Sequence, residues 1–299
     1  MSLGSGPNIK APMMTRRRLL QGASLGVAAM ATGATGVSLV DSDHLVVERV
    51  EVWLARLESG WDRLRIAQLS DFHYMKPEDG ALIRQAVALA NSLNPDLIAL
   101  TGDYITGGYR RGRSDLDACA EILSELRAPL GVFAVLGNHD HPRFAPQALE
   151  AQKIAVLRNS ALSLERGAAR LWITGVEDVL SRDASVDQAL QSIPEGEATV
   201  LLAHEPDYAE TVKGLSVDLQ LSGHSHGGQI RVPGVGPLYV PPLARMYPAG
   251  MYRLGGLTLY TNRGLGTVGP RLRFNCPPEV TLFTLRSGID PRNSANADK

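Results

Sequence analysis

The sequence has few of the features that place a chain in a special class. It contains two cysteines, Cys119 and Cys276, which are too few for a disulfide framework, and the pattern leaves open whether they pair or stay buried as free thiols. The formal net charge is −1 and aromatic residues make up 5% of the chain, so there is neither a global basic field nor a base-stacking platform. We therefore expect no nucleic-acid partner.

Histidine is also scarce, and its placement is informative. Five of the seven histidines lie in short blocks that also contain Asp, Asn or Gly. In chain order the blocks are Asp71-x-His73, Gly102-Asp103, Gly137-Asn138-His139-Asp140, His204 and Gly223-His224-Ser225-His226. Carboxylate, amide and imidazole groups bind divalent metal ions, and a set without thiolate fits Mn, Fe, Zn or Ni. The series predicts a site for two divalent ions whose identity stays open.

The first forty residues differ from the rest of the chain. Arg16-Arg17-Arg18 precedes a run from Leu19 to Val40 that contains no charge. A basic segment followed by an apolar segment is typical of an export signal, and the paired arginines resemble a twin-arginine signal. We expect residues 1–40 to direct the protein through the twin-arginine export machinery to a periplasmic or other extracytoplasmic site. The pattern leaves open whether the signal is cleaved or kept as a membrane anchor.

The remaining chain has ordinary globular composition, with 44% hydrophobic and 20% charged residues in the whole sequence. Short apolar strands alternate with helical segments in the first half, and strands dominate the second half. We predict strands at 45–54, 64–69, 96–100, 132–136, 171–175, 199–203, 217–221, 229–232, 256–260 and 280–285, and helices at 80–92, 114–126, 185–191 and 206–213. This pattern predicts an α/β domain over 41–286, with two sheets packed face to face and helices outside, and a disordered tail over 287–299.

The position of the metal-type blocks supports the metal prediction. Asp71, Asp103 and Asn138 each come shortly after a buried apolar strand. Ligand sites at the carboxyl ends of strands are expected in open α/β sheets. Asp103 has two carboxylate oxygens and could bridge two ions, while the neutral amide of Asn138 would keep the site attractive to an anionic substrate. Each block alone could be a turn or a helix cap, so the prediction depends on all of them together.

The series from Asp71 to His226 resembles the calcineurin-like metallophosphoesterase superfamily. Within it, segments 204–207 and 223–229, with the later segments 262–267 and 277–279, resemble a bacterial subgroup of exported or membrane-associated phosphodiesterases. Some members of that subgroup hydrolyse the pyrophosphate bond of UDP-diacylglucosamine. The resemblance implies a four-layer α/β fold, in which two packed β-sheets are flanked by helices, and a metal-dependent phosphoric ester hydrolase.

The resemblance also implies a role for each matching residue. The two ligand sets share one carboxylate: they are Asp71, His73, Asp103 and His226 for the first ion, and Asp103, Asn138, His204 and His224 for the second. His139 is implied to be a catalytic non-ligand that faces the leaving group or a phosphoryl oxygen, and Asp140 to orient it. In the implied mechanism, a hydroxide that bridges ions roughly 3.5–4 Å apart attacks phosphorus in line with the leaving oxygen.

Three classes of function are compatible with this pattern. The first is a phosphodiesterase or pyrophosphatase that acts on a small-molecule or lipid-linked phosphoester. The second is a phosphomonoesterase or a protein phosphatase. The third is a non-catalytic scaffold on the same fold, which the intact ligand series disfavours.

Three further features could contact the substrate or a membrane. Arg263 lies in a glycine-rich loop, where its planar guanidinium either binds a substrate phosphate or faces solvent. His141 adjoins the third block and either contacts substrate or faces solvent. The apolar stretch 237–248 is either a surface for acyl chains or peripheral membrane contact, or a proline-bounded edge hairpin packed on the core.

Overall fold

The computed structural model describes residues 44–107 and 113–294. The predicted signal or anchor at 1–40 and residues 295–299 of the predicted tail lie outside these ranges. Within the described ranges, no helix is both long enough and apolar enough to cross a membrane.

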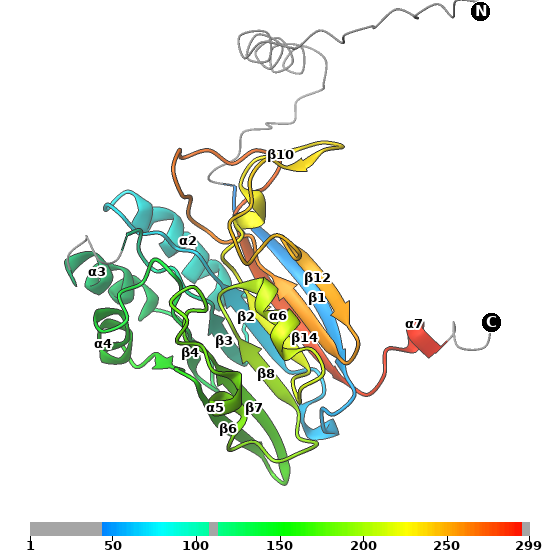
Figure 1. The fold of residues 1–299 in the computed structure, drawn as a ribbon. Coiled ribbons are helices and arrows are strands. Elements are labelled where there is room, and N and C mark those ends of the chain that lie inside the picture. Colours follow the sequence, from blue (N-terminus) through cyan, green and yellow to red (C-terminus); the bar gives the residue numbers. More distant parts are fainter. Residues whose placement is uncertain (1–43, 108–112, 295–299) are drawn as a thin grey trace, which may run out of the picture. The chain divides into compact units, whose positions relative to one another are not determined.

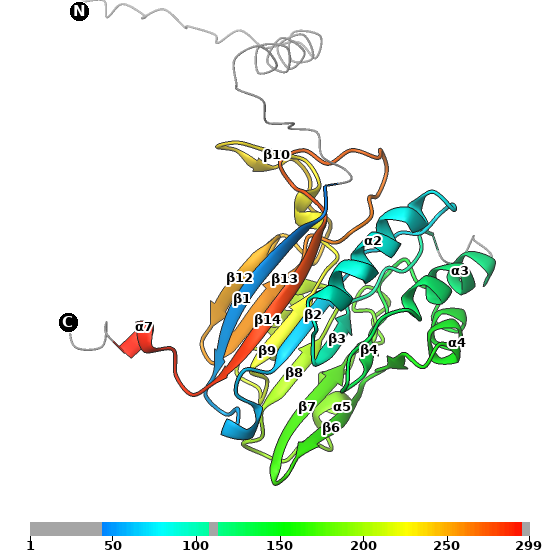
Figure 2. The same ribbon diagram turned by 180° about the vertical axis from the view of Figure 1, so that it is seen from behind.

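Two six-stranded mixed sheets lie at the centre of the described chain (Figures 1 and 2). The first has the order β1-β14-β2-β3-β4-β5. Its strands are β1 (Val46–Leu54), β14 (Glu279–Ser287), β2 (Arg65–Leu69), β3 (Leu97–Leu100), β4 (Val132–Ala134) and β5 (Ala155–Val156). Strands β2 to β5 run parallel, whereas β14 is antiparallel to β2 and parallel to β1. The last strand of the chain therefore lies inside the sheet, between β1 and β2.

The second sheet has the order β12-β13-β9-β8-β7-β6. Its strands are β12 (Gly250–Leu254), β13 (Leu257–Thr261), β9 (Leu219–Ser222), β8 (Thr199–Leu202), β7 (Ala169–Gly175) and β6 (Ser160–Arg166). The four central strands run parallel, and the two edge strands are antiparallel to their neighbours. A separate small hairpin pairs β10 (Arg231–Val232) with β11 (Gly236–Pro237).

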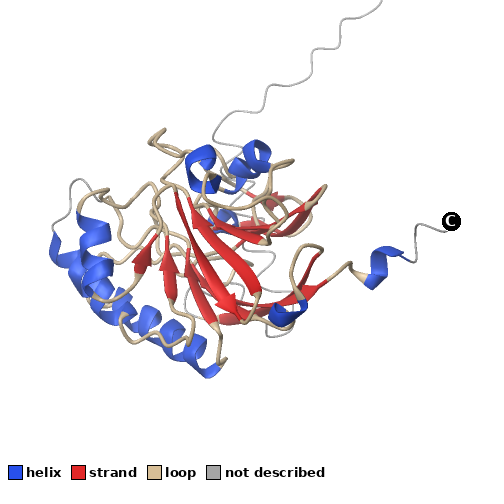
Figure 3. Ribbon diagram, turned by 90° about the horizontal axis from the view of Figure 1, so that it is seen from below, coloured by secondary structure: helices blue, strands red, loops and turns tan. Residues whose placement is uncertain are grey.

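Side chains that alternate along the central strands build four layers. In β3, Leu97 and Ala99 pack between the sheets, while Ile98 and Leu100 pack under the outer helices. These helices are α2 (Asp79–Ser92), α3 (Arg113–Leu123) and α4 (Phe144–Ala151). The outer face of the second sheet is covered by α5 (Val186–Leu190), η2 (Pro206–Tyr208) and α6 (Ala209–Val212). The order helix, sheet, sheet, helix (Figure 3) confirms the predicted fold class.

Several elements differ from the sequence prediction. The edge strands β6 and β12 were not predicted, because their half-exposed, mixed polar residues give a weak strand signal. Helix α4 was not predicted either, since it contains Pro146, which is tolerated in the first turn of a helix. A short turn, η1 (Ser59–Trp61), adds the fully buried Trp61 to the core between the sheets.

The predicted disordered tail begins too early. Strand β14 continues to Ser287, and Pro291–Ser294 form the short helix α7. Between these elements, the carboxylate of Asp290 is buried and pairs with Arg253 of β12 at 3.0 Å. This ion pair fixes the segment after β14, so the domain extends beyond residue 286.

Both cysteines are buried and free. Cys119 lies in α3 and Cys276 lies just before β14. Burial raises the pKa of both thiols, so neither is a reactive thiolate at neutral pH.

Candidate metal centre

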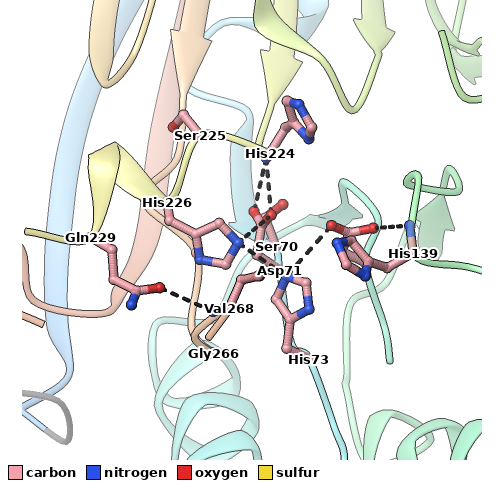
Figure 4. A network of polar contacts seen from close by, with 12 residues as sticks. Ser70, Asp71, His73, His139, His224, Ser225, His226, Gln229, Gly266 and Val268 are labelled. Carbon is pink, nitrogen blue, oxygen red and sulfur yellow. Dashed lines mark hydrogen bonds and ion pairs between the residues drawn. The ribbon is translucent and has the colours of Figure 1, made fainter. Parts of the chain in front are cut away.

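The predicted metal blocks come together at one end of the two sheets (Figure 4). Parallel strands of both sheets end there, so the loops that follow them meet. Six of the seven predicted ligands form two groups, and in each group the potential ligand atoms lie within 4.8 Å of one another. The groups are Asp71, His73 and His226, and Asp103, His204 and His224. All six side chains are buried.

Asp103 lies between the two groups. Its Oδ2 is 3.5 Å from Nε2 of His73 and 3.2 Å from Nε2 of His204. Its other oxygen, Oδ1, accepts the backbone N–H of His139 at 2.8 Å. One oxygen is thus fixed by the backbone, and the other is within reach of both groups, as a bridging ligand requires.

In the first group, three ligand atoms converge. Nε2 of His73 and Nε2 of His226 are 3.0 Å apart, and Nε2 of His226 is 3.5 Å from Oδ1 of Asp71. Nδ1 of His73 is 3.0 Å from the hydroxyl of Thr106, which leaves Nε2 for an ion. The backbone N–H of His224 donates to both carboxylate oxygens of Asp71, at 3.0 and 3.1 Å. This bond links the ligand loops of the two sheets.

In the second group, backbone carbonyls orient the imidazoles. Nδ1 of His204 donates to the carbonyl of Thr101 at 2.6 Å, and Nε2 of His224 donates to that of Pro242 at 2.9 Å. When each ring is neutral, its opposite nitrogen has the lone pair that a metal-ligating histidine needs. Oδ1 of Asn138 is buried without a hydrogen-bond partner among the described residues, and Nε2 of His204 faces only the carboxylate of Asp103 at 3.2 Å. A divalent cation would satisfy both atoms, so the residues match the two-ion prediction.

Burial and mutual attraction set the charges of these ligands. Burial lowers the pKa of His73 to about 3, that of His224 to about 4 and that of His226 well below its usual value. These three rings are therefore neutral at pH 7 and can bind an ion. Burial opposes the charges of Asp103 and His204, but their mutual attraction holds the pKa of Asp103 well below and that of His204 well above the usual range. A cation would displace the proton of His204.

The backbones of most ligands are strained. The φ angles of five ligands lie between 47° and 66°, and these ligands are Asp71, His73, Asp103, His224 and His226. Residues other than glycine rarely adopt this left-handed region. Such conformations persist only where the surrounding structure holds them, and they cluster at functional sites.

Asp140 holds the ligand loops through backbone N–H groups. Its Oδ2 accepts the backbone N–H groups of Gly137 and Asp103, and its Oδ1 accepts that of Tyr104, each at 2.8 Å. A Cβ atom at Gly137 would collide with the carboxylate of Asp103, so these loops touch directly. Three backbone donors thus bind this carboxylate, and the implied role of Asp140 in orienting His139 stays a prediction.

His139 lies beside the ligand groups without belonging to either. Its ring stands edge-on to that of His73, with the centroids 5.0 Å apart. The backbone N–H of Gly107 donates to Nδ1 of His139 at 3.1 Å. Nδ1 is therefore an acceptor, and the hydrogen of the neutral ring lies on Nε2, where it can be donated to a substrate oxygen. This position agrees with a non-ligand role, which stays a prediction.

Two predicted substrate contacts are engaged elsewhere. The guanidinium of Arg263 pairs with Glu279 at 2.5 Å and with Glu48 at 2.6 Å. Nδ1 of His141 accepts two backbone N–H groups at the start of α4, at 3.2 and 3.4 Å. Neither residue lines the cavity beside the metal ligands. In the structure Arg263 thus ties its loop to β1 and β14, and His141 caps α4, while contact of either residue with substrate stays a prediction.

A cavity of about 430 Å³ opens beside both ligand groups. Part of it is lined by six residues of the metal blocks, which are Asp103, Asn138, His139, His224, Ser225 and His226. The rest is lined largely by apolar side chains, among them Leu180, Ile230, Leu238, Tyr239, Pro241, Pro242, Val268 and Pro270. The first part of the predicted apolar stretch therefore lies at the site. Its later part does not, because Tyr247 is buried and donates to Glu210 at 2.6 Å.

Some groups at the site had not been predicted. The carbonyls of Thr101 and Pro242 and the N–H of Gly107 hold three of the imidazoles. Any residue can supply a backbone group, so the sequence carries no signal for these roles. Gln229 is the one unpredicted side chain that the motif could have revealed, because it ends the Gly223–Gln229 segment.

Comparison with known proteins places the chain in a family. The family model of the calcineurin-like phosphoesterases matches residues 64–228. YkuE of Bacillus subtilis, described as an uncharacterized metallophosphoesterase, is 34% identical over 92% of this chain and 98% of its own length. The chain belongs to the calcineurin-like phosphoesterase family. The phosphodiesterase YaeI of Escherichia coli is 32% identical, over 91% of this chain and 100% of its own. The UDP-2,3-diacylglucosamine pyrophosphatase LpxG of Chlamydia trachomatis is 26% identical, over 74% and 83%.

Family membership and geometry agree on the chemistry of the site. This calcineurin-like phosphoesterase is a metal-dependent phosphoester hydrolase. Its two ligand groups, with Asp103 between them, form a dinuclear centre for divalent metal ions. The cavity beside them is where a phosphoester would bind.

Proposed function

We propose that this protein is an exported phosphodiesterase or pyrophosphatase whose substrate carries a large apolar group, such as a nucleotide-lipid or another lipid-linked phosphoester of the cell envelope. The observation that carries this proposal is the cavity, which has metal ligands in one part and a largely apolar lining along the rest. The names of two relatives support it, since YaeI is called a phosphodiesterase and LpxG a pyrophosphatase of a diacylated nucleotide sugar.

The apolar lining could contribute substantially to substrate binding. Leu238 and Tyr239 remain 63% and 68% exposed, although both line the cavity. Covering such surface with an acyl chain is worth about 25 cal/mol per Å² of apolar area. A small polar phosphoester would leave this surface in water.

The two sides of the cavity are tied together, so the lining is preformed. The side-chain Oε1 of Gln229 accepts the backbone N–H of Val268 at 3.0 Å (Figure 4), and its Nε2 donates to the carbonyl of Pro270 at 3.1 Å. Gln229 follows η3 (His226–Gly228), which carries a metal ligand. The loop at 268–270 is thus fixed relative to the metal centre.

The residues of the chain divide the chemical work. When bound, two divalent ions would supply a clamp for phosphoryl oxygens and lower the pKa of a water so that it can attack at neutral pH. The neutral amide of Asn138 and the neutral imidazoles limit the negative charge, which favours an anionic substrate. His139 would donate its Nε2 hydrogen to a phosphoryl or leaving oxygen, where negative charge grows as the phosphoester bond breaks.

A substrate comparison tests the proposal against its alternatives. Metal-loaded full-length protein should hydrolyse bis-nitrophenyl phosphate faster than nitrophenyl phosphate, and lipid-linked nucleotides faster than free nucleotides. Preference for the monoester would favour a phosphomonoesterase or protein phosphatase. Absence of turnover on every substrate, with both ions bound, would favour a scaffold. Metal analysis of natively exported protein would show which of Mn, Fe, Zn or Ni it carries.

Export and membrane contact are parts of the same proposal. The support for export is the pair Arg16-Arg17 before an uncharged apolar run. In a host with twin-arginine export, full-length protein should reach the extracytoplasmic fraction, and replacing both arginines with lysine should retain it in the cytoplasm. Unchanged distribution of the variant would contradict the proposal. The exposed rim of Leu238 and Tyr239 supports peripheral contact with a bilayer, where a lipid-linked substrate resides.

A further inference from the structure

Arg273 is a fully buried arginine outside the ligand set, with 0% of its surface exposed. Its guanidinium donates only to backbone carbonyls: Nη1 to Cys276 at 3.2 Å, and Nη2 to Arg263, Gly264 and Gly266 at 3.0, 3.2 and 2.6 Å. Among the described residues, no carboxylate lies within ion-pair distance of it. Arginine is almost never fully buried without a charged partner, so a specific role must offset the cost.

The loop that Arg273 holds packs directly on the first ligand group (Figure 4). The N–H of Leu265 donates to the carbonyl of Ser70 at 3.0 Å, and that of Gly266 to the carbonyl of Asp71 at 2.7 Å. A Cβ atom on Gly266 would lie 2.8 Å from Cβ of His73. Only glycine permits this approach, so the position of the loop and that of the ligand turn depend on each other.

The ligand turn requires such support. Asp71 and His73 have φ angles of 52° and 47°, both in the left-handed region. Two strained residues so close in sequence would relax to other conformations unless neighbouring groups fixed the backbone between them. The two loop N–H groups bind the carbonyls of Ser70 and Asp71, which lie on either side of the Cα atom of Asp71, and Arg273 fixes the loop that carries them.

We propose that Arg273 is a positioning residue for Asp71 and His73, two metal ligands of the first group. Its planar fork gathers the carbonyls of the 263–266 loop, and the loop in turn holds the strained ligand turn. The second ligand group receives no such support from Arg273. The proposal rests on the metal-binding role of the first group and not on any particular substrate.

Ion binding to full-length protein tests this role without measuring hydrolysis. Metal-free protein is titrated with Mn²⁺, and the bound ions per chain are counted. Arg273→Lys keeps the charge but cannot span several carbonyls. It should therefore lower the affinity for one of the two ions by about 10- to 100-fold, as loss of a group that supports a ligand typically does. Gly266→Ala, which forces the loop away from His73, should lower the affinity for the same ion.

Two controls separate positioning from general destabilisation. Gly256→Ala adds a Cβ that meets nothing within 4 Å, and Arg56→Lys weakens the ion pair of Arg56 with Asp218, 2.8 Å long and remote from the ligand groups. Both controls should bind two ions as the wild type does, even where thermal unfolding of the metal-free protein shows a loss of stability.

A double variant shows which ion is affected. In a His226→Ala background, which already lacks a ligand of the first group, Arg273→Lys should remove no further ion. In a His224→Ala background, Arg273→Lys should lower the affinity for the remaining ion. Two ions bound with wild-type affinity in both Arg273→Lys and Gly266→Ala would overturn the proposal, and so would equal weakening of both ions. If Arg273→Lys fails to fold, Gly266→Ala decides alone.

Discussion

The backbone N–H of Gly107 donates to Nδ1 of His139, with 3.1 Å between the two nitrogens. A backbone amide can only donate, so the neutral ring of His139 carries its hydrogen on Nε2. The ring is thereby set as a donor beside the ligand groups. We expect the role of His139 to depend on this hydrogen bond.

Replacing His139 should slow turnover without loss of metal. His139→Ala removes the donor for a phosphoryl or leaving oxygen, so kcat should fall by about 10²- to 10⁴-fold. Metal analysis should still find two ions per chain. His141→Ala is the matched control, because this histidine caps α4; it should lower stability by about 1 kcal/mol and leave kcat near the wild-type value. Loss of an ion from His139→Ala would show that His139 is a ligand.

Replacing Asp140 should destabilise the ligand loops. In Asp140→Asn, an NH₂ group takes the place of one of the oxygens that accept the backbone N–H groups of Gly137, Asp103 and Tyr104. A buried donor left without its acceptor costs about 1–3 kcal/mol. Denaturant unfolding of the metal-free variant should show this loss, whereas Asp117→Asn on the exposed face of α3 should not. An unchanged unfolding free energy with reduced kcat would instead restore the implied role of orienting His139.

The apolar lining of the cavity should determine the KM for lipid-linked substrates. Leu238→Ser and Tyr239→Ser remove apolar surface from the cavity, so KM for a lipid-linked phosphoester should rise by about tenfold, which corresponds to about 1.4 kcal/mol. Hydrolysis of bis-nitrophenyl phosphate should change little. Val235→Ser is the matched control, since Val235 is 74% exposed but does not line the cavity. Equal KM values for all three variants would argue against an acyl-binding role.

The metal ligands could be predicted from the sequence because short apolar strands are easy to recognise, and the ligand blocks come shortly after them. Strands such as Leu97–Leu100 are buried on both faces and read as continuous apolar runs. Parallel strands bring their carboxyl ends to one edge, so order along the chain was enough to bring Asp71, Asp103 and Asn138 together. The four-layer fold followed from the same alternation of strands and helices together with the family resemblance.

The partners of charged side chains could not be predicted in this way. Arg263 stands in a glycine-rich loop where its guanidinium could bind a phosphate, but in the structure the guanidinium donates to Glu48, 215 positions away. The buried position of Arg273 was equally hidden, since an arginine in a segment with prolines and other arginines reads as surface. Such pairings depend on the packing of β1 and β14 against the ligand loops, and the local pattern does not contain that information.

The most direct test of the dinuclear centre is Asp103→Ala. Oδ2 of Asp103 lies within reach of both His73 and His204. Removal of this carboxylate should therefore lower the affinity for both ions and abolish hydrolysis of bis-nitrophenyl phosphate. Ions per chain and turnover are measured on the same preparations of wild type and variant. The wild type should bind two ions and hydrolyse the substrate, whereas the variant should lose bound ions and show no turnover. A variant that keeps two ions and full turnover would contradict the dinuclear assignment.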